Sequence, residues 1–292
     1  MNDEDEAYIL LLLSDSNLPT GSFVASAGLE SYVKHGFASL PGSTTTTFVR
    51  DNLASYARSA LPFVTDAHRI VSRFRSPTII TDAGKGAESG DRETIDDLEW
   101  TTTKLAALDD LYDTMTLNHI ARRASKSQGV ALLTLFSKGF SRPSGFSVPS
   151  DAETQNIPEL RINGLLEHFK VMVRKEGTHG HLPTCWGVLT AALGLSLERS
   201  QYLHLFLHAR SLLSASVRLN NIGPYGAQQL LVHAIRPLVA TETNRCKDLR
   251  SGLLEVPGQE FDSTEQGPAN TWPLGEILAA RHDLQHSRIF NS

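Results

Sequence analysis

The sequence predicts an all-α protein, a single bundle-like helical domain of about nine or ten helices with two polar loop insertions. Apolar residues recur at the helical spacings of three and four, whereas the alternation typical of a half-buried strand is scarce. At 292 residues, with 40% hydrophobic and 20% charged residues, the chain can bury a substantial core. No shift in composition marks a domain boundary, so we expect residues 1–292 to form one domain.

The first stretch, residues 10–36, combines an apolar segment, a turn and a helix. Pro19 fixes one backbone angle of the turn, and Gly21 tolerates conformations that other residues avoid. Ser22 can cap a helix that we predict over residues 22–35, where small side chains surround a few large apolar ones. Such a helix either packs closely in a core or docks on a partner, and its local chemistry leaves both open.

Helical spacing predicts most of the remaining elements, with prolines and glycines between them. The predicted helices cover Thr44–Tyr56, Leu61–Arg75, Leu98–Ser125, Gln128–Phe140, Leu160–Glu176, Pro183–Gly194, Leu197–Leu219, Gln228–Arg250 and Leu274–Phe290. Pro237 should kink the eighth of these. In the helix before it, Arg210 and Arg218 lie on or near the apolar line, where a guanidinium requires partners such as Glu30, Asp110 or a backbone carbonyl.

The helix predicted over Leu98–Ser125 has the most regular apolar period in the chain. Its stripe is formed by Leu105, Leu108, Tyr112 and Met115. We therefore place Asp109, Asp110 and Asp113 on its solvent-exposed side. Arg122 and Arg123 should end this helix, because cations favour a helix C-terminus.

Two polar stretches, residues 76–93 and 141–158, have the composition of exposed loops. We also expect mobile termini at residues 1–6 and 281–292.

Charge and cysteine content narrow the class of protein. The formal net charge of −5 disfavours a nucleic-acid binder, which needs a concentrated positive field. Cys185 and Cys246 are the only cysteines, which excludes a disulfide framework and favours a reducing, cytoplasmic location. Four acidic residues precede the N-terminal apolar run, unlike a secretory signal, and no stretch reaches the roughly 20 apolar residues of a membrane span.

A metal site is one candidate for chemistry. His179, His181 and Cys185 fall within seven residues, and imidazole with thiolate suits nickel or zinc. The stretch supplies no carboxylate and no fourth ligand, so we assign no metal site and keep these three residues as weak candidates. The alternative is structural, with His181 capping the helix that Pro183 opens.

No motif in the sequence indicates an enzyme. The glycine-containing stretch Ala83–Gly90 lacks the spacing of a phosphate-binding loop, and no serine or cysteine sits in a nucleophile elbow. We therefore expect a protein that is not an enzyme and works by binding. An all-α small-molecule enzyme remains the less favoured alternative.

Five stretches together resemble one family, the urease accessory protein UreF. They are LLLLSDSNLPTGSFVASAGLESYVKHG at 10–36, RRASKSQG at 122–129, GHLPTCWGVLTAALG at 180–194, SASVRL at 214–219 followed by Gln228, and RHDLQHSRIFNS at 281–292. Each stretch is weak alone, but five in this order, spanning nearly the whole chain, are specific. The polar loops look like lineage insertions, so the chain resembles a eukaryotic-type member.

The resemblance implies an all-α homodimer that binds the accessory protein UreD, also called UreH, and engages the nickel-carrying GTPase UreG. Together these proteins would deliver nickel to apo-urease, the complex handling nickel with no cofactor held tightly by this chain. It implies Glu30 as the first partner-facing residue, Arg122 and Arg123 in central helices, Arg218 and Gln228 near dimer or core contacts, and a tail at 281–292 that docks on UreD. The implied partner-binding residues are Pro19, Gly21, Phe23, Gly28, Glu30, Tyr32, Lys34, Arg122, Arg123, Arg218, Gln228, Arg281, His282, Arg288 and Phe290.

A chaperone that binds nickel directly through His179, His181 and Cys185 is the alternative to that reading.

Overall fold

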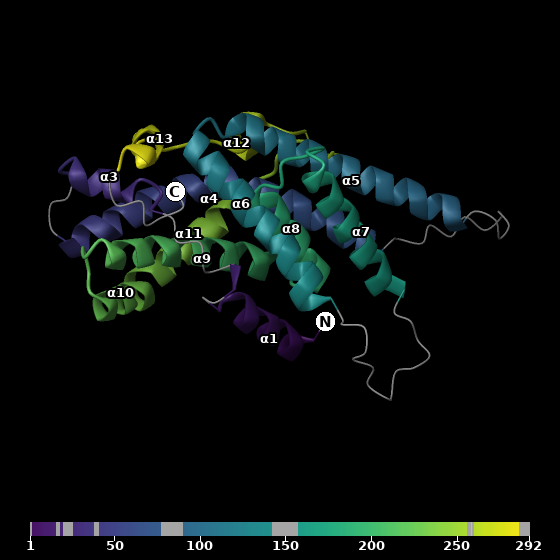
Figure 1. Cartoon of the computed structure of the whole chain (residues 1–292), viewed down its shortest axis with the longest axis horizontal. Coiled ribbons are helices and arrows are strands. Elements are labelled where there is room, and N and C mark those ends of the chain that lie inside the picture. The colour runs from purple at the N-terminus through teal and green to yellow at the C-terminus, as the bar shows by residue number, and fades with distance from the viewer. Residues whose placement is uncertain are drawn as a thin grey trace.

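The computed structural model describes residues 2–15, 18–19, 26–37, 41–76, 90–141, 157–255, 258 and 260–285. Throughout these residues the regular structure is helical and no strand occurs, which confirms the predicted all-α class (Figure 1). None of the helices in these ranges combines the length and apolar character needed to cross a bilayer.

The helices follow one another in a simple order along the chain. They are α1 (Asp3–Leu13), α3 (Leu29–Lys34), α4 (Pro41–Arg75), α5 (Gly90–Met115), α6 (His119–Leu135), α7 (Ile157–Arg174), α8 (Leu182–Leu193), α9 (Leu197–Arg218), α10 (Pro224–Leu230), α11 (Arg236–Cys246), α12 (Ser263–Gln266) and α13 (Pro273–Ala280). Two π-helical turns also occur, η1 (Phe136–Phe140) after α6 and η2 (Leu231–Ile235) between α10 and α11, and a 3-10 turn, η3 (His282–Leu284), follows α13.

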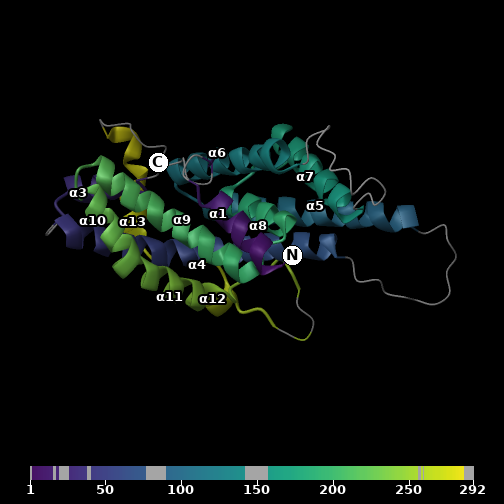
Figure 2. The same cartoon turned by 90° about the horizontal axis from the view of Figure 1, so that it is seen from below.

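Helix α8 lies at the centre of the fold, packed along α4 and in contact with α6 and α9 (Figure 2). The side chain of Trp186 in α8 is 1% exposed, and its indole N–H donates a hydrogen bond to the carbonyl of Ser200 over 3.1 Å. Gly187 lets the two backbones approach, because a Cβ there would lie 2.6 Å from the carbonyl oxygen of Val64. Close backbone packing of α8 on α4 therefore sets the geometry of the core.

The predicted boundary between two helices at residues 57–60 is wrong, because it falls inside α4. Residues 44–56 and 61–75, expected as separate helices, belong to one helix that continues through Pro62. Proline removes a backbone hydrogen bond and strains a helix, but its neighbours Leu61 and Phe63 are both fully buried. Burial on both sides of Pro62 outweighs the local cost.

A second correction concerns the helix predicted over residues 98–125. It is divided, because α5 ends at Met115 and the side chain of Asn118 caps α6 by accepting from the backbone N–H groups of Ile120 and Ala121. Arg122 and Arg123 consequently lie near the start of α6 and do not end a helix. The stretch 128–140, expected as a separate helix, completes α6 and η1.

The two polar stretches predicted to be exposed loops extend too far at their C-terminal ends. Residues 90–93 open α5 and residues 157–158 open α7, while 77–89 and 142–156 lie outside the described residues. Around Pro237 the expected irregularity takes the form of η2, a wide turn directly before the proline.

Both chain ends are more structured than predicted within the described residues. Residues 3–6 form the first turn of α1, and Glu6 accepts hydrogen bonds from the backbone and hydroxyl of Ser196, each at 2.7 Å. The predicted C-terminal helix stops at Ala280 and is followed by η3, while residues 286–292 lie outside the described ranges.

Two histidines of α9 are packed against α4. His204 is 4% exposed and shares a 3.0 Å hydrogen bond with the hydroxyl of Tyr56, whose ring stacks on His208 at 3.8 Å. His208 also shares a 2.7 Å hydrogen bond with the amide oxygen of Asn52. Burial lowers the pKa of His204 to about 3, with a smaller contribution from His208. Burial also lowers the pKa of the half-buried His208 to about 3, so both rings are neutral near pH 7.

This pair predicts loss of stability in acid. Because the folded-state pKa of His204 lies below the ordinary value of about 6.5, the unfolded chain binds its proton more tightly. The stabilisation is complete above pH about 6.5 and is lost as the pH falls toward 3, at no more than about 1.4 kcal/mol per pH unit for one proton. Urea unfolding at pH 7, 6 and 5 should show a shallower pH dependence for His204→Gln than for the native chain. The exposed control His233→Gln should keep the native slope, and equal slopes for all three would contradict the prediction.

Candidate functional site

The first sequence signature and the C-terminal segment meet in the fold. The helix predicted over residues 22–35 begins only at Leu29, because Ala27 and Gly28 have left-handed φ angles of 44° and 94°; residues 20–25 lie outside the described part. A Cβ on Gly28 would lie 2.8 Å from the backbone nitrogen of Ala279 in α13. The absence of a side chain at Gly28 thus allows α13 to pack directly against the start of α3.

Polar contacts hold the end of the described chain on α3. The ammonium of Lys34 donates to Oε1 of Gln285 over 2.7 Å, and the amide nitrogen of Gln285 donates to the hydroxyl of Ser31 over 2.9 Å. Lys34 also lies 3.3 Å from a carboxylate oxygen of Glu30, which is only 4% exposed. Glu30, implied as the first partner-facing residue, is therefore covered by its own chain in this conformation.

The start of α6 holds the other side of the same segment. Arg123 binds both carboxylate oxygens of Asp283, at 2.8 and 3.3 Å, and this guanidinium lowers the pKa of the Asp283 carboxyl. Asn118 donates from its amide to the carbonyl of Glu276 in α13 over 3.2 Å. His282, between these contacts, is buried.

Three large apolar side chains stand exposed beside these contacts. Leu117 is 86% exposed, Ile277 62% and Leu284 70%, and each is the sequence neighbour of a residue that ties α13 or η3 to α6. We call the set of Leu117, Arg123, Ile277, Asp283 and Leu284 the α13 surface. Exposed apolar groups rimmed by charge are typical of protein-binding surfaces.

The other implied partner-binding residues are distributed between this end of the fold and places away from it. Tyr32 stacks on Phe37 with ring centroids 5.3 Å apart and meets Phe48 edge-on, which makes it part of the local packing. Arg122 donates to the carbonyl of Thr116. Arg281 is exposed beside η3, Pro19 is partly buried, and Gly21, Phe23, Arg288 and Phe290 lie outside the described residues.

Arg218 and Gln228 lie apart from the α13 surface, at the end of α9 and in α10. Both are exposed, so the expectation that Arg218 lies near the buried line of its helix is wrong. Arg210, on the same helix, is partly buried and donates to the backbone carbonyl of Ser14, one of the partners proposed for it.

Asp109 is a buried carboxylate that organises the loop before α8. Its two oxygens accept four hydrogen bonds, from the hydroxyl of Thr178 and from the backbone nitrogens of residues 179, 180 and 181, at 2.6 to 2.9 Å. Asp109 is fully buried, so its predicted place on the solvent side of the helix is wrong. The apolar stripe of α5 gave no sign of a loop folding over that side; the only sequence signal was the short polar turn after Gly177.

The weak metal candidates do not share a ligand geometry. His181 is fully buried, and its ring hydrogen-bonds Ser125 at 3.1 Å and Asp113 at 3.0 Å. His181 is the N-cap residue of α8, as expected, but its side chain makes no capping hydrogen bond, and Ser125 accepts from the N–H of Leu182 instead. Cys185 is fully buried, which raises the pKa of its thiol. Among the residues that the structure describes, no group of three histidine, cysteine or acidic side chains is arranged to hold a metal ion.

His179 instead belongs to a charged cluster. It lies 3.4 Å from Asp110 and shares a 3.0 Å hydrogen bond with Lys126, whose ammonium is 2.7 Å from Asp113. Burial raises the pKa of Asp113, but the hydrogen bonds from Lys126 and His181 outweigh this and lower it to about 2. This cluster joins α5, α6 and the loop before α8.

Fold and site together define a class: a helical protein whose candidate site is an exposed surface of apolar and charged side chains. The UreF family profile matches residues 42–235. Urease accessory protein 6 of Cryptococcus neoformans var. grubii is 43% identical, covering 98% of this chain and 97% of the relative. Urease accessory protein F of Arabidopsis thaliana is 30% identical over 96% of this chain and 90% of its own. An uncharacterized UreF-like urease accessory protein of Schizosaccharomyces pombe is 29% identical, covering 100% and 99%.

The chain belongs to the urease accessory protein UreF family. Membership implies a role in urease maturation. The relatives are named as accessory proteins and not as enzymes, in agreement with the prediction that this chain is not an enzyme.

Removing the charge of Asp109 should destabilise the fold. In Asp109→Asn one carboxylate oxygen becomes an amide that faces N–H donors, so we expect a loss of roughly 3 kcal/mol or more in the free energy of unfolding. Asp110→Asn is the matched control, because Asp110 is one residue away with a side chain 59% exposed, and it should change stability by less than about 0.5 kcal/mol. Urea unfolding measures both, and equal effects would show that the buried carboxylate does not organise the loop.

Proposed function

We propose that this chain acts in the cytoplasm as a scaffold that joins UreD/UreH-type and UreG-type accessory proteins to apo-urease, so that nickel can be delivered. The observation that carries the proposal is the junction between the first and last sequence signatures. Gly28, an implied partner residue, meets α13 there, and Lys34 and Arg123, also implied, meet the 281–285 segment beside exposed apolar groups.

We place the contact with a UreD-type partner on the α13 surface. Leu117, Ile277 and Leu284 offer apolar area that this chain leaves in water, and burying one such side chain typically contributes about 1.5–3 kcal/mol. The exposed pair of Arg123 and Asp283 adds little stability of its own, but it fixes the position of η3. Affinity would then come from the apolar anchors and orientation from the ion pair.

A different face suits a second copy of the chain. Arg218 and Gln228, implied near dimer contacts, are exposed at the end of α9 and in α10, where Tyr225 is 89% exposed. We propose that homodimerisation uses this end of α9 and α10. The α13 surface would then stay available for the other accessory proteins.

Co-expression tests the proposed function directly. Urease would be produced with its other accessory proteins, with and without this chain, and its nickel content measured after purification. We expect nickel-poor urease when the chain is missing and restored nickel when it is supplied. Equal nickel content in the two preparations would refute the proposed role.

A substitution on the α13 surface tests the proposed contact. Ile277→Asp should weaken the complex with the UreD-type protein at least tenfold while leaving the melting curve unchanged, because Ile277 is 62% exposed. Leu160→Asp is a matched control on α7, where Leu160 is 58% exposed, and should bind normally. Calorimetric titration measures both, and equal affinities would place the contact elsewhere.

A further inference from the structure

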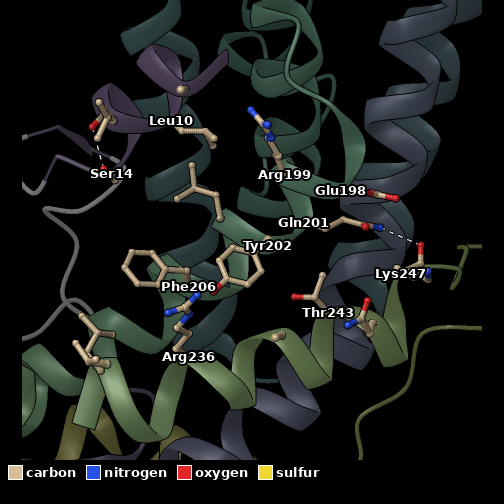
Figure 3. A pocket seen from close by; sticks show the side chains of 17 residues that line it. Leu10, Ser14, Glu198, Arg199, Gln201, Tyr202, Phe206, Arg236, Thr243 and Lys247 are labelled. Carbon is tan, nitrogen blue, oxygen red and sulfur yellow. Dashed lines mark hydrogen bonds between the residues drawn. The ribbon is translucent and has the colours of Figure 1, made fainter. Parts of the chain in front are cut away.

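A groove of about 910 Å³ lies between α1, α9 and the run formed by η2 and α11, apart from the α13 surface (Figure 3). Figure 3 shows Tyr202 and Phe206 of α9 between Leu10 on α1 and Arg236 on α11. The volume lies near the upper end of the range for small-ligand pockets. None of the residues of the α13 surface lines this groove.

Helix α1 forms one wall because polar contacts hold it at its two ends. Near its start, Arg199 of α9 lies 3.0 Å from Glu6 and 3.3 Å from Asp3. Past its end, Arg210 donates to the carbonyl of Ser14. The turns between these contacts leave Leu11 70% exposed at the groove, on a helix whose one buried residue is Leu13.

All three walls present residues at helical spacing. The lining positions are 7, 10, 11 and 14 on α1, 198, 199, 201, 202, 203 and 206 on α9, and 231, 232, 236, 240, 243, 244 and 247 along η2, α11 and the residue after it. Steps of three and four along each wall are the pattern with which helices receive another helix. The π-helical turn η2 shifts the helical register of the third wall. Val232, which belongs to η2 and lies at the rim of the groove, is 46% exposed.

The charge of the groove indicates the chemistry of its occupant. Arg199 is matched by Asp3 and Glu6, whereas Arg236 and Lys247 form no ion pair with any other described residue. Glu198 is the one acid among the lining residues. The groove thus carries excess positive charge on a chain of net charge −5, which favours a negatively charged partner.

We propose that this groove docks one amphipathic helix of a partner protein, with leucine-like side chains at spacings of three and four flanked by carboxylates. The apolar stripe would cover Leu10, Leu11 and Phe206, and the carboxylates would meet Arg236 and Lys247. The inference rests on the proposed function only in that the chain works by binding proteins. It assigns a second docking site, separate from the α13 surface.

A phage-displayed library of 18-residue amphipathic helices, in acidic and basic versions, is the probe. The full chain serves as bait, with Val232→Asp as counter-bait, and the affinity of enriched peptides is measured by fluorescence anisotropy. We expect enrichment of acidic helices with leucine-like stripes. Val232→Asp and Arg236→Glu should each weaken binding at least tenfold, while Val171→Asp, whose residue is 40% exposed on α7, should bind like the native chain.

Several results would overturn this proposal. The first two are equal enrichment of peptides on the native and Val232→Asp baits, and a preference for basic helices. The other two are stoichiometric binding of palmitate in competition with the peptides, and dissociation of a homodimer by Val232→Asp in sedimentation velocity. Melting curves by circular dichroism verify that the variants fold. Because the measurement contains no urease, its failure leaves the nickel-content test of the proposed function standing, and the converse also holds.

Discussion

The buried carboxylate of Asp109 is the interaction on which the arrangement of α5, α6 and α8 depends. Removing a charged carboxylate from water is costly, and here four hydrogen bonds from the loop at 178–181 offset that cost. The loop lies directly on α6, because at Gly129 even a Cβ would collide with the carbonyl of Gly180. One side chain of α5 thereby fixes where α8 begins and how closely α6 approaches.

The position of the α13 surface depends on this arrangement of α5, α6 and α8. Helix α6 packs against the Asp109 loop through Gly129 and, nearer its own start, holds the C-terminal segment through Asn118 and Arg123. The α13 surface is therefore supported by a helix that the core keeps in place. Rigid support of this kind lowers the entropy lost when a partner binds.

Sequence periodicity predicted the helical class and most helices, because apolar spacing depends on local geometry. It misplaced helix boundaries that depend on contacts distant in the sequence. At Pro62, burial of the flanking residues lets one helix continue where two were predicted, and at Asn118 a helix cap divides a regular apolar stripe into two helices. The side of a helix that faces solvent was judged from its apolar residues alone, so Asp109 was placed in water. Glu30 shows the same limit: the family signature marks it, but only the fold reveals that it is buried, with Lys34 of α3 paired to its carboxylate.

The pairing of Lys34 with Gln285 joins residues 251 positions apart. During synthesis, α3 can pack early against Phe48 of α4, but its contact with Gln285 forms only after residue 285 has emerged, and contacts of such long sequence separation form slowly. The surface beside α13 consequently forms late in synthesis, once residue 285 is available. The last described residues must therefore be made before α3 and the segment at 281–285 can meet.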